Sequence, residues 1–278
     1  DDFVAHYREL GAAHIVFLDN GSRDGTLERA ARLDGVTVLS TAAPYRTYAR
    51  IAKRYLIDRY GKSGWVLCVD IDELFDYPYR DQVPLPAFLR YLRQHRFNAV
   101  VGHLLDLFPS GPLLETDAPR SEHRYYDISR VEREPYEQAH GNGNRAADPS
   151  LSVYSGGIRA TAFGARVNLT KHPLVYPPDG PVFVTSHRVL GARVADVTTV
   201  LLHYKYVGAF YEHAHRVVRE RSYYQDSAEY RRYLEALGEQ PRLQLLSETS
   251  RELTSVDQLL GEGFLSVSDA YRRFACER

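Results

Sequence analysis

The chain has 278 residues, 26% of them charged and 44% hydrophobic, which is enough to bury the core of one large α/β domain or two small ones. Its 35 basic and 36 acidic residues give a formal net charge of −1, so charge offers no reason to expect a nucleic-acid partner. Cys68 and Cys276 are too few and too distant for a disulfide framework or a zinc site, and no apolar stretch approaches the roughly 20 residues that cross a bilayer. We therefore expect a cytoplasmic protein, with peripheral contact at the inner membrane face left open.

The first 61 residues predict alternating helices and strands. Residues 3–10 have the spacing of an amphipathic helix, residues 13–18 and 36–39 read as strands, and helices are expected over 27–33 and 45–60. This order predicts a parallel sheet with right-handed crossovers. Because the chain begins inside a helix and contains no methionine, we expect the first strand and most of the first helix to lie upstream.

An apolar run over residues 65–69 ends in three carboxylates, Asp70, Asp72 and Glu73. Such a run is typical of a strand buried on both faces in a parallel sheet, and ligands bind beyond the carboxyl ends of such strands. In extended backbone Asp70 and Asp72 point to the same side, where their mutual repulsion is relieved by a cation. Carboxylate oxygens select Mg²⁺ or Mn²⁺, so the pattern predicts a metal-assisted reaction on a phosphate-bearing substrate. The alternative is a solvated strand end.

Downstream elements are expected in the following order. Residues 86–94 predict a helix and 97–107 a strand that ends near Asp106, whereas 110–155 lack periodicity and resemble a long functional loop. Antiparallel strands are expected over 156–164, 169–175 and 182–187. A strand over 197–202 leads into His203 and Lys205, and helices follow over 208–224, 229–237 and from 255 onward.

Two blocks in this order resemble a known family. The turn Leu18-Asp19-Asn20-Gly21-Ser22-Arg23-Asp24-Gly25-Thr26 is similar to the nucleotide-binding turn of family 2-type glycosyltransferases, and residues 65–75 are similar to their metal-binding DxD strand. Later blocks, at 156–164, 169–174, 186–187 and 201–206, resemble a bacterial branch of that family. The resemblance implies a GT-A fold: a Rossmann-like mixed, mainly parallel sheet flanked by helices, followed by antiparallel strands and helices. It further implies a GT-A domain over residues 1–225 and a helical extension over 226–278 that packs on it.

The resemblance also implies roles for individual residues. Asp19 would contact the nucleobase, Asp70 the ribose or the metal shell, and Asp72 a divalent Mn²⁺ or Mg²⁺ that bridges two donor phosphates. His203 is the expected late metal ligand, with His187 as the rival. Residues expected near phosphates or acceptor groups are Lys205, Arg159 and Lys171.

An inverting transferase needs a base for the acceptor hydroxyl. We expect Asp106 to be that base, with Asp127 and Asp148 as substitutes, and Glu73 to orient Asp72 or the acceptor or to cap a turn.

The implied function is transfer of a sugar from a nucleotide-diphosphate donor, a UDP-sugar by preference, to a carbohydrate or glycolipid acceptor in bacterial polysaccharide assembly. Two other interpretations remain open from the sequence. A phosphohydrolase of the haloacid-dehalogenase type also places Asp-x-Asp after an apolar strand and binds Mg²⁺. A non-catalytic nucleotide-sugar or carbohydrate-binding module would bind without turnover.

Overall fold

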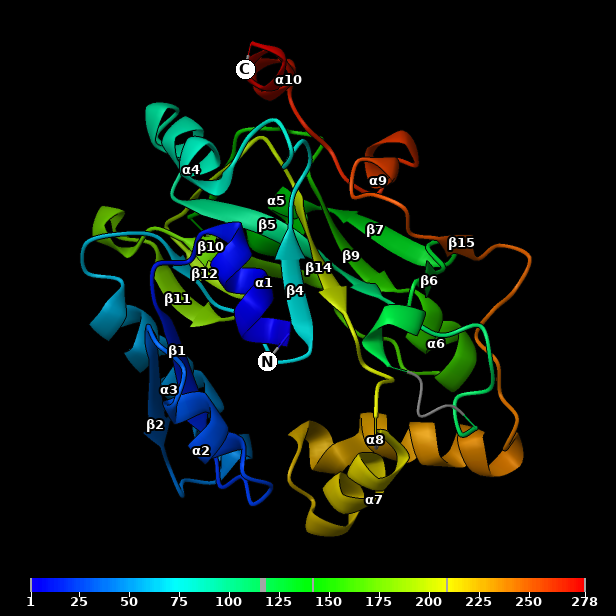
Figure 1. The fold of residues 1–278 in the computed structure, drawn as a ribbon. Helices are drawn as coiled ribbons and strands as arrows, with labels where there is room; N and C mark the ends of the chain where they lie inside the picture. Colours follow the sequence, from blue (N-terminus) through cyan, green and yellow to red (C-terminus); the bar gives the residue numbers. More distant parts are fainter. Residues whose placement is uncertain (1, 116–118, 142, 209, 278) are drawn as a thin grey trace.

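A computed structural model describes residues 2–115, 119–141, 143–208 and 210–277 (Figure 1). The fold is mixed α/β, and its centre is a seven-stranded sheet. The central strand β5 (Ala99–Asp106) is buried along its whole length. It lies between β10 (Thr170–Val175) on one side and β13 (Arg193–Val194) and β14 (Thr199–His203) on the other. The sheet is completed by β3 (Val66–Leu67) beside β10, β4 (Glu73–Asp76) beside β14, and β8 (Arg145–Ala146) beside β13.

The prediction of a mainly parallel sheet is wrong. Three pairings of the central sheet are parallel, namely β5 with β13, β5 with β14, and β8 with β13. The other three, β3 with β10, β5 with β10, and β4 with β14, are antiparallel. The physical reason is that strands from the second half of the chain lie between strands from the first half. β10 lies between β3 and β5, and β14 lies between β5 and β4, so β3, β4 and β5 do not pair with one another.

The first two strands form a sheet of their own. β1 (Ile15–Asp19) and β2 (Val36–Ser40) pair in parallel, as expected for a strand-helix-strand unit that contains α2 (Thr26–Ala31). In Figure 1 this pair lies with α3 (Tyr45–Tyr60) to one side of the central sheet, below α1 (Asp2–Leu10). The predicted helices and strands of this region are confirmed. Their expected union with the strand over 65–69 in one sheet is wrong, because β3 pairs with β10.

Two predicted strands differ in the structure. The strand over 65–69 is reduced to β3, and a turn at Ile71 and Asp72 separates it from β4. Its residues are only half-buried, because they line a cleft. The strand over 156–164 is instead the short helix α6 (Ile158–Phe163). Gly157 before it and Gly164 after it have φ of 67° and 62°, a left-handed backbone that glycine adopts without strain. These glycines bracket one and a half helical turns.

The segment over 110–155 is not one irregular loop, as expected, but includes several short helices and strands. It contains β6 (Tyr125–Tyr126), β7 (Val131–Pro135), α5 (Tyr136–His140), β8 and β9 (Ser152–Gly156). β7 and β9 form an antiparallel pair whose strands are joined by 16 intervening residues, a separation that hides the hairpin from local sequence signals. Residues 116–118 and 142 of this prediction lie outside the described residues.

The remaining elements enclose the sheet. They are α4 (Leu85–Gln94), β11 (Val182–Thr185), β12 (Arg188–Leu190), α7 (Phe210–Glu220), α8 (Tyr224–Glu239), β15 (Arg251–Glu252), α9 (Gln258–Gly261) and α10 (Asp269–Cys276). Leu259, Phe264 and Tyr271 from the end of the chain are buried in the same core as Phe75 and Phe88. A second core joins α6, α7 and α8 through Phe163, Phe210 and Tyr233. Within the described ranges, every helix is too short or too polar to cross a bilayer.

A substitution at Gly102 can test the close packing around β5. A Cβ at this position would lie 2.8 Å from Cγ of Pro173 on β10 and 3.0 Å from Oγ1 of Thr199 on β14. Because both neighbours belong to buried strands, we expect Gly102→Ala to lower the free energy of unfolding by about 1–3 kcal/mol. Gly64→Ala is the control, since nothing lies within 4 Å of a Cβ there. Urea unfolding of both variants measures the difference, and equal stability of the two would contradict this packing.

Candidate functional site

The candidate site forms where three strands of the central sheet run side by side. In the register of the sheet, His203 on β14 lies opposite Glu73 on β4 and opposite Asp106 on β5. Glu73, Asp106 and His203 are all buried. The sequence prediction that Asp106 and His203 each lie at the end of a strand is therefore confirmed. The structure adds that these strands are neighbours, so strand pairing aligns three ionisable side chains in one row.

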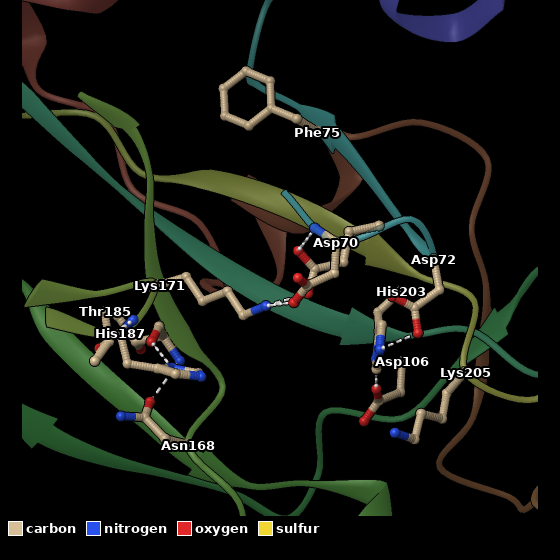
Figure 2. A network of polar contacts seen from close by, with 12 residues as sticks. Asp70, Asp72, Phe75, Asp106, Asn168, Lys171, Thr185, His187, His203 and Lys205 are labelled. Carbon is tan, nitrogen blue, oxygen red and sulfur yellow. Dashed lines mark hydrogen bonds and ion pairs between the residues drawn. The ribbon is translucent and has the colours of Figure 1, made fainter. Parts of the chain in front are cut away.

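A continuous chain of polar contacts crosses this row (Figure 2). The His203 ring lies between two carboxylates: its Nε2 is 3.3 Å from Oδ2 of Asp72, and its Nδ1 is 2.5 Å from Oδ1 of Asp106. The other oxygen of Asp106 accepts a hydrogen bond of 2.8 Å from Nε of Arg159 on α6. Arg159 then reaches Glu229 of α8, with 3.4 Å between Nη1 and Oε1. We call this set the histidine network.

Lys205 extends the histidine network from the end of β14. Its Nζ donates a hydrogen bond of 3.1 Å to the hydroxyl of Tyr230 and lies 3.8 Å from Oε1 of Glu229. Burial alone would lower the pKa of Lys205, but the neighbouring Tyr230 and Glu229 raise it, so the ammonium stays charged. A cation is thus held in place by Tyr230 and Glu229, and its charge also acts on the carboxylate of Asp72.

Mutual stabilisation fixes the charges in this network. Burial by itself would lower the pKa of His203, but Asp72 and the hydrogen bond with Asp106 raise it to about 9. Burial would raise the pKa values of both carboxylates, yet His203 beside Asp72, and Arg159 with His203 beside Asp106, hold them well below their usual range. At neutral pH the imidazole is therefore protonated and both carboxylates are ionised.

A second set of contacts, the lysine network, surrounds Asp70. Its Oδ1 is 2.5 Å from Nζ of Lys53 on α3, and its Oδ2 is 2.8 Å from Nζ of Lys171 on β10. Lys171 also contacts Oε1 of Glu73, whose Oε2 accepts a hydrogen bond of 3.1 Å from the backbone N–H of Asp70. Burial would raise the pKa of Asp70, but the two ammonium groups hold it well below its usual range.

The two aspartates of the DxD pattern consequently serve different networks. The expectation that Asp70 and Asp72 point to one side of an extended strand is wrong, because the chain turns at Ile71 and Asp72. The backbone N–H of Glu73 closes this turn on the carbonyl of Asp70 at 3.1 Å. Asp70 thereby meets the lysines, whereas Asp72 meets His203 (Figure 2).

Both networks open into one cleft of about 1760 Å³. The cleft runs between β1 and α3 on one side and β3 and the central sheet on the other. Most of the charged side chains of the two networks line it, among them Lys53, Asp70, Asp72 and His203. Apolar side chains from residues 15–18 of β1, from residues 66–69 and from α3 line it as well.

The other predicted site residues lie in different surroundings. Asp19 accepts hydrogen bonds from the backbone N–H groups of Gly21 and Ser22, and so shapes the turn after β1, beside Leu18 and Asn20 of the cleft wall. His187 lines the cleft, with Nδ1 at 2.7 Å from the carbonyl of Thr170, and burial lowers its pKa to about 4. A direct contact with nucleobase stays a prediction for Asp19.

The two substitute bases are placed outside this cleft. Asp127 accepts hydrogen bonds from Ser129 N–H at 2.8 Å and Thr249 Oγ1 at 2.7 Å, and Asp148 accepts from Ser150. Asp106 itself is 6% exposed and has both oxygens engaged by His203 and Arg159. This position suits orientation of His203 better than removal of a proton from an acceptor.

Sequence reasoning missed Lys53 and Glu229. Lys53 falls in a helix rich in arginine, where a lysine signals a solvated face, and Glu229 falls in a predicted packing helix. A weak signal exists for Lys53: it follows Tyr45 and Ala49 at intervals of four, so the three residues share one helical face. Ala49 on this face is buried.

A divalent metal fits one part of the site. Asp72, Glu73 and His203 each offer a ligand atom, and these atoms all lie within 4.8 Å of one another. Glu73 already has both oxygens engaged, whereas the side chain of Asp72 is 36% exposed toward the cleft. His203 would bind through Nε2 after losing its proton, and Asp106 at Nδ1 supplies the carboxylate that commonly orients a metal-binding histidine. Asp70 does not belong to this group, and both of its oxygens are ion-paired with lysine side chains.

Comparisons with known proteins add no relative: no family model, no curated protein and no solved structure matches the chain. The chemistry of the site therefore has to be argued from its own residues.

The charge of His203 can be tested by titration. Without added divalent ions, we expect its ring to titrate near pH 9, above the ordinary value of about 6.5. Since the folded-state pKa is raised, the stabilisation is complete below about pH 6.5 and is lost as pH rises through 9. NMR of the histidine ring carbons, assigned by comparison with His203→Gln, measures the midpoint.

In the same experiment, Asp72→Asn removes the facing carboxylate and should lower the His203 midpoint. A wild-type midpoint at or below 6.5 would contradict the ion-paired arrangement. His187 serves as an internal comparison, because its pKa is lowered.

Proposed function

We propose that this protein is a divalent-metal-dependent glycosyltransferase of the GT-A type, which transfers a sugar from a nucleotide-diphosphate donor to a hydroxyl of a carbohydrate or glycolipid. The observation that carries the proposal is that Asp72 and His203, two candidate ligands of one metal ion, line the same cleft as lysine ammonium groups. A metal held by these two side chains, with lysine ammonium groups nearby, suits the negative charges of a sugar-diphosphate.

Charge balance supports a metal accompanied by an anion. The two networks contain five cationic and five anionic side chains when His203 is protonated: Lys53, Lys171, His203, Arg159 and Lys205 against Asp70, Glu73, Asp72, Asp106 and Glu229. Because His203 gives up its proton when it binds a metal, the networks then contain four cationic and five anionic side chains, and a diphosphate adds several more negative charges. Because uncompensated buried charge is costly, the anion is best accepted together with a divalent cation.

The residues of the chain then have distinct tasks. Asp72 and His203 would hold the metal, which when bound supplies Lewis-acid stabilisation of the leaving diphosphate. Asp106 keeps the Nδ1 proton of His203 in place and so directs Nε2 toward Asp72. Lys205 and Lys171 contribute fixed positive charge for phosphate oxygens, and Arg159 secures Asp106. Asp106 is thus proposed as a positioning residue, in place of the catalytic base expected from the sequence.

No observation favours the phosphohydrolase over the transferase. In that class the first aspartate of the pattern attacks phosphorus, whereas both oxygens of Asp70 are ion-paired with lysines. The binding-module alternative differs from the transferase only in turnover, so the experiment below includes a turnover measurement.

Asp72 is the residue whose removal tests the proposal most directly. Calorimetric titration of UDP and GDP, with and without Mn²⁺, should give metal-dependent binding of one nucleotide by the wild type. We expect Asp72→Asn, which keeps the shape of the side chain, to weaken that binding roughly tenfold or more because a charged ligand is lost. Asp148→Asn is the matched control, since that carboxylate serves a turn outside the cleft.

Turnover separates the remaining alternatives. Release of nucleoside diphosphate from a nucleotide-sugar supports a transferase, release of inorganic phosphate from a phosphomonoester supports a phosphohydrolase, and binding without either supports a module. Failure of the folded wild type to bind any nucleotide would overturn the proposal.

Asp106→Asn tests the positioning role. The amide can no longer stabilise the imidazole at Nδ1 as a carboxylate does, so Mn²⁺ affinity should fall roughly 10–100-fold. The variant also leaves Arg159 buried with less compensating charge, so a lower stability is expected as well. Mn²⁺ titration followed by proton relaxation, at a temperature where the variant is folded, makes the measurement. Unchanged Mn²⁺ affinity together with a lost transfer rate would instead assign Asp106 as the base.

A further inference from the structure

Lys53 is the more accessible of the two ammonium groups on Asp70. Its side chain is 22% exposed and lines the cleft, whereas that of Lys171 is 6% exposed. Lys171 is additionally bound to the buried Glu73, so it is fixed at two points. Lys53 reaches Asp70 from α3, on the opposite wall of the cleft, through a single ion pair.

Asp70 therefore has two cationic partners, Lys53 and Lys171, for one carboxylate charge. If Lys53 leaves, the 2.8 Å contact with Lys171 still provides Asp70 with a counter-charge. The departure of Lys53 does not strand a buried carboxylate, which is the usual cost of breaking such a pair. A lysine suits this exchange, because its ammonium is a compact charge with three donors on a flexible stem.

We propose that Lys53 is a phosphate-binding residue that exchanges its ammonium from Asp70 to a phosphoryl oxygen when a diphosphate enters the cleft, while Lys171 stays on Asp70. This inference rests on the proposed function and adds to it a residue of the opposite wall. The ligand class is the diphosphate group of a nucleotide.

The geometry of α3 agrees with a nucleotide as the ligand. Tyr45 lies eight residues before Lys53 on the same helical face, about 12 Å along the axis at 1.5 Å per residue. Tyr45 lines the cleft, and its ring stacks with that of Tyr223 at a centroid distance of 6.4 Å and an interplanar angle of 13°. One helix thus brings an aromatic side chain and a cation to the same cleft, and these are groups that the base and the phosphates of a nucleoside diphosphate can contact.

The test is a comparison of Lys53→Met with Lys62→Met. Both changes remove one lysine charge and keep an unbranched side chain, but Lys62 is exposed and does not line the cleft. Calorimetry in Mn²⁺ uses inorganic pyrophosphate, UDP, UMP and uridine as probes, with GDP and its relatives in their place if the wild type prefers guanine. Thermal unfolding verifies that both variants fold, as expected for a partly exposed ion pair of small net value.

We expect Lys53→Met to weaken pyrophosphate and diphosphate binding roughly tenfold or more, to affect the monophosphate less, and to leave nucleoside binding unchanged. Lys53→Arg should restore part of the affinity, and Lys62→Met should match the wild type. Equal diphosphate affinity in Lys53→Met and wild type would overturn the inference while leaving the proposed function intact. An equal loss of nucleoside affinity would also overturn it, since that result indicates a structural role. If the wild type binds neither pyrophosphate nor nucleotide, the proposed function fails as well.

Discussion

The need to compensate buried charge governs the architecture of this protein. The carboxylates of Glu73 on β4 and Asp106 on β5 lie where water has little access, and burying either charge without a partner would cost several kcal/mol of stability. His203 and Arg159 meet Asp106 from β14 and α6, while Lys171 meets Glu73 from β10. Because every one of these partners comes from a different element, the charges hold together a sheet whose strands are far apart in sequence. The register of β14 with β4 and β5 is accordingly as much an electrostatic requirement as a packing one.

The sequence was informative wherever a local pattern determined structure. Strand periodicity correctly placed Asp106 and His203 at the ends of strands, and helix spacing correctly predicted α3 and α4. It failed where a distant contact or a single backbone angle decided the outcome. The backbone at Gly157 and Gly164, on either side of α6, has positive φ values that glycine permits and that alternation of side chains cannot reveal. The order of strands in the sheet depends on β10 and β14 inserting beside β5, which no local signal encodes.

The same distinction explains what could be known of the site. Residue type and strand position pointed to Asp70, Asp72 and Asp106, and the family resemblance added Lys171 and His203. The structure brings all of them to one cleft or its floor. Their pairings could not be predicted, because the turn at Ile71 directs Asp70 and Asp72 to different partners. The sequence did not identify Lys53 as a site residue, because its contact with Asp70 depends on α3 lying across the cleft from that carboxylate.

Separation of the two aspartates has a chemical consequence. Carboxylates that share one cation compete for it, whereas here Asp70 is saturated by ammonium groups and Asp72 keeps a side chain that is 36% exposed. In the proposed function, a divalent ion would therefore bind Asp72 and His203, and not Asp70, whose oxygens are ion-paired with lysines. The two networks meet at adjacent residues, Asp72 and Glu73. Under the proposed function, one phosphoryl group of a diphosphate would therefore contact a metal held by Asp72 and His203, while the other would lie near the lysines, an arrangement that a single phosphoryl group could not provide at both places.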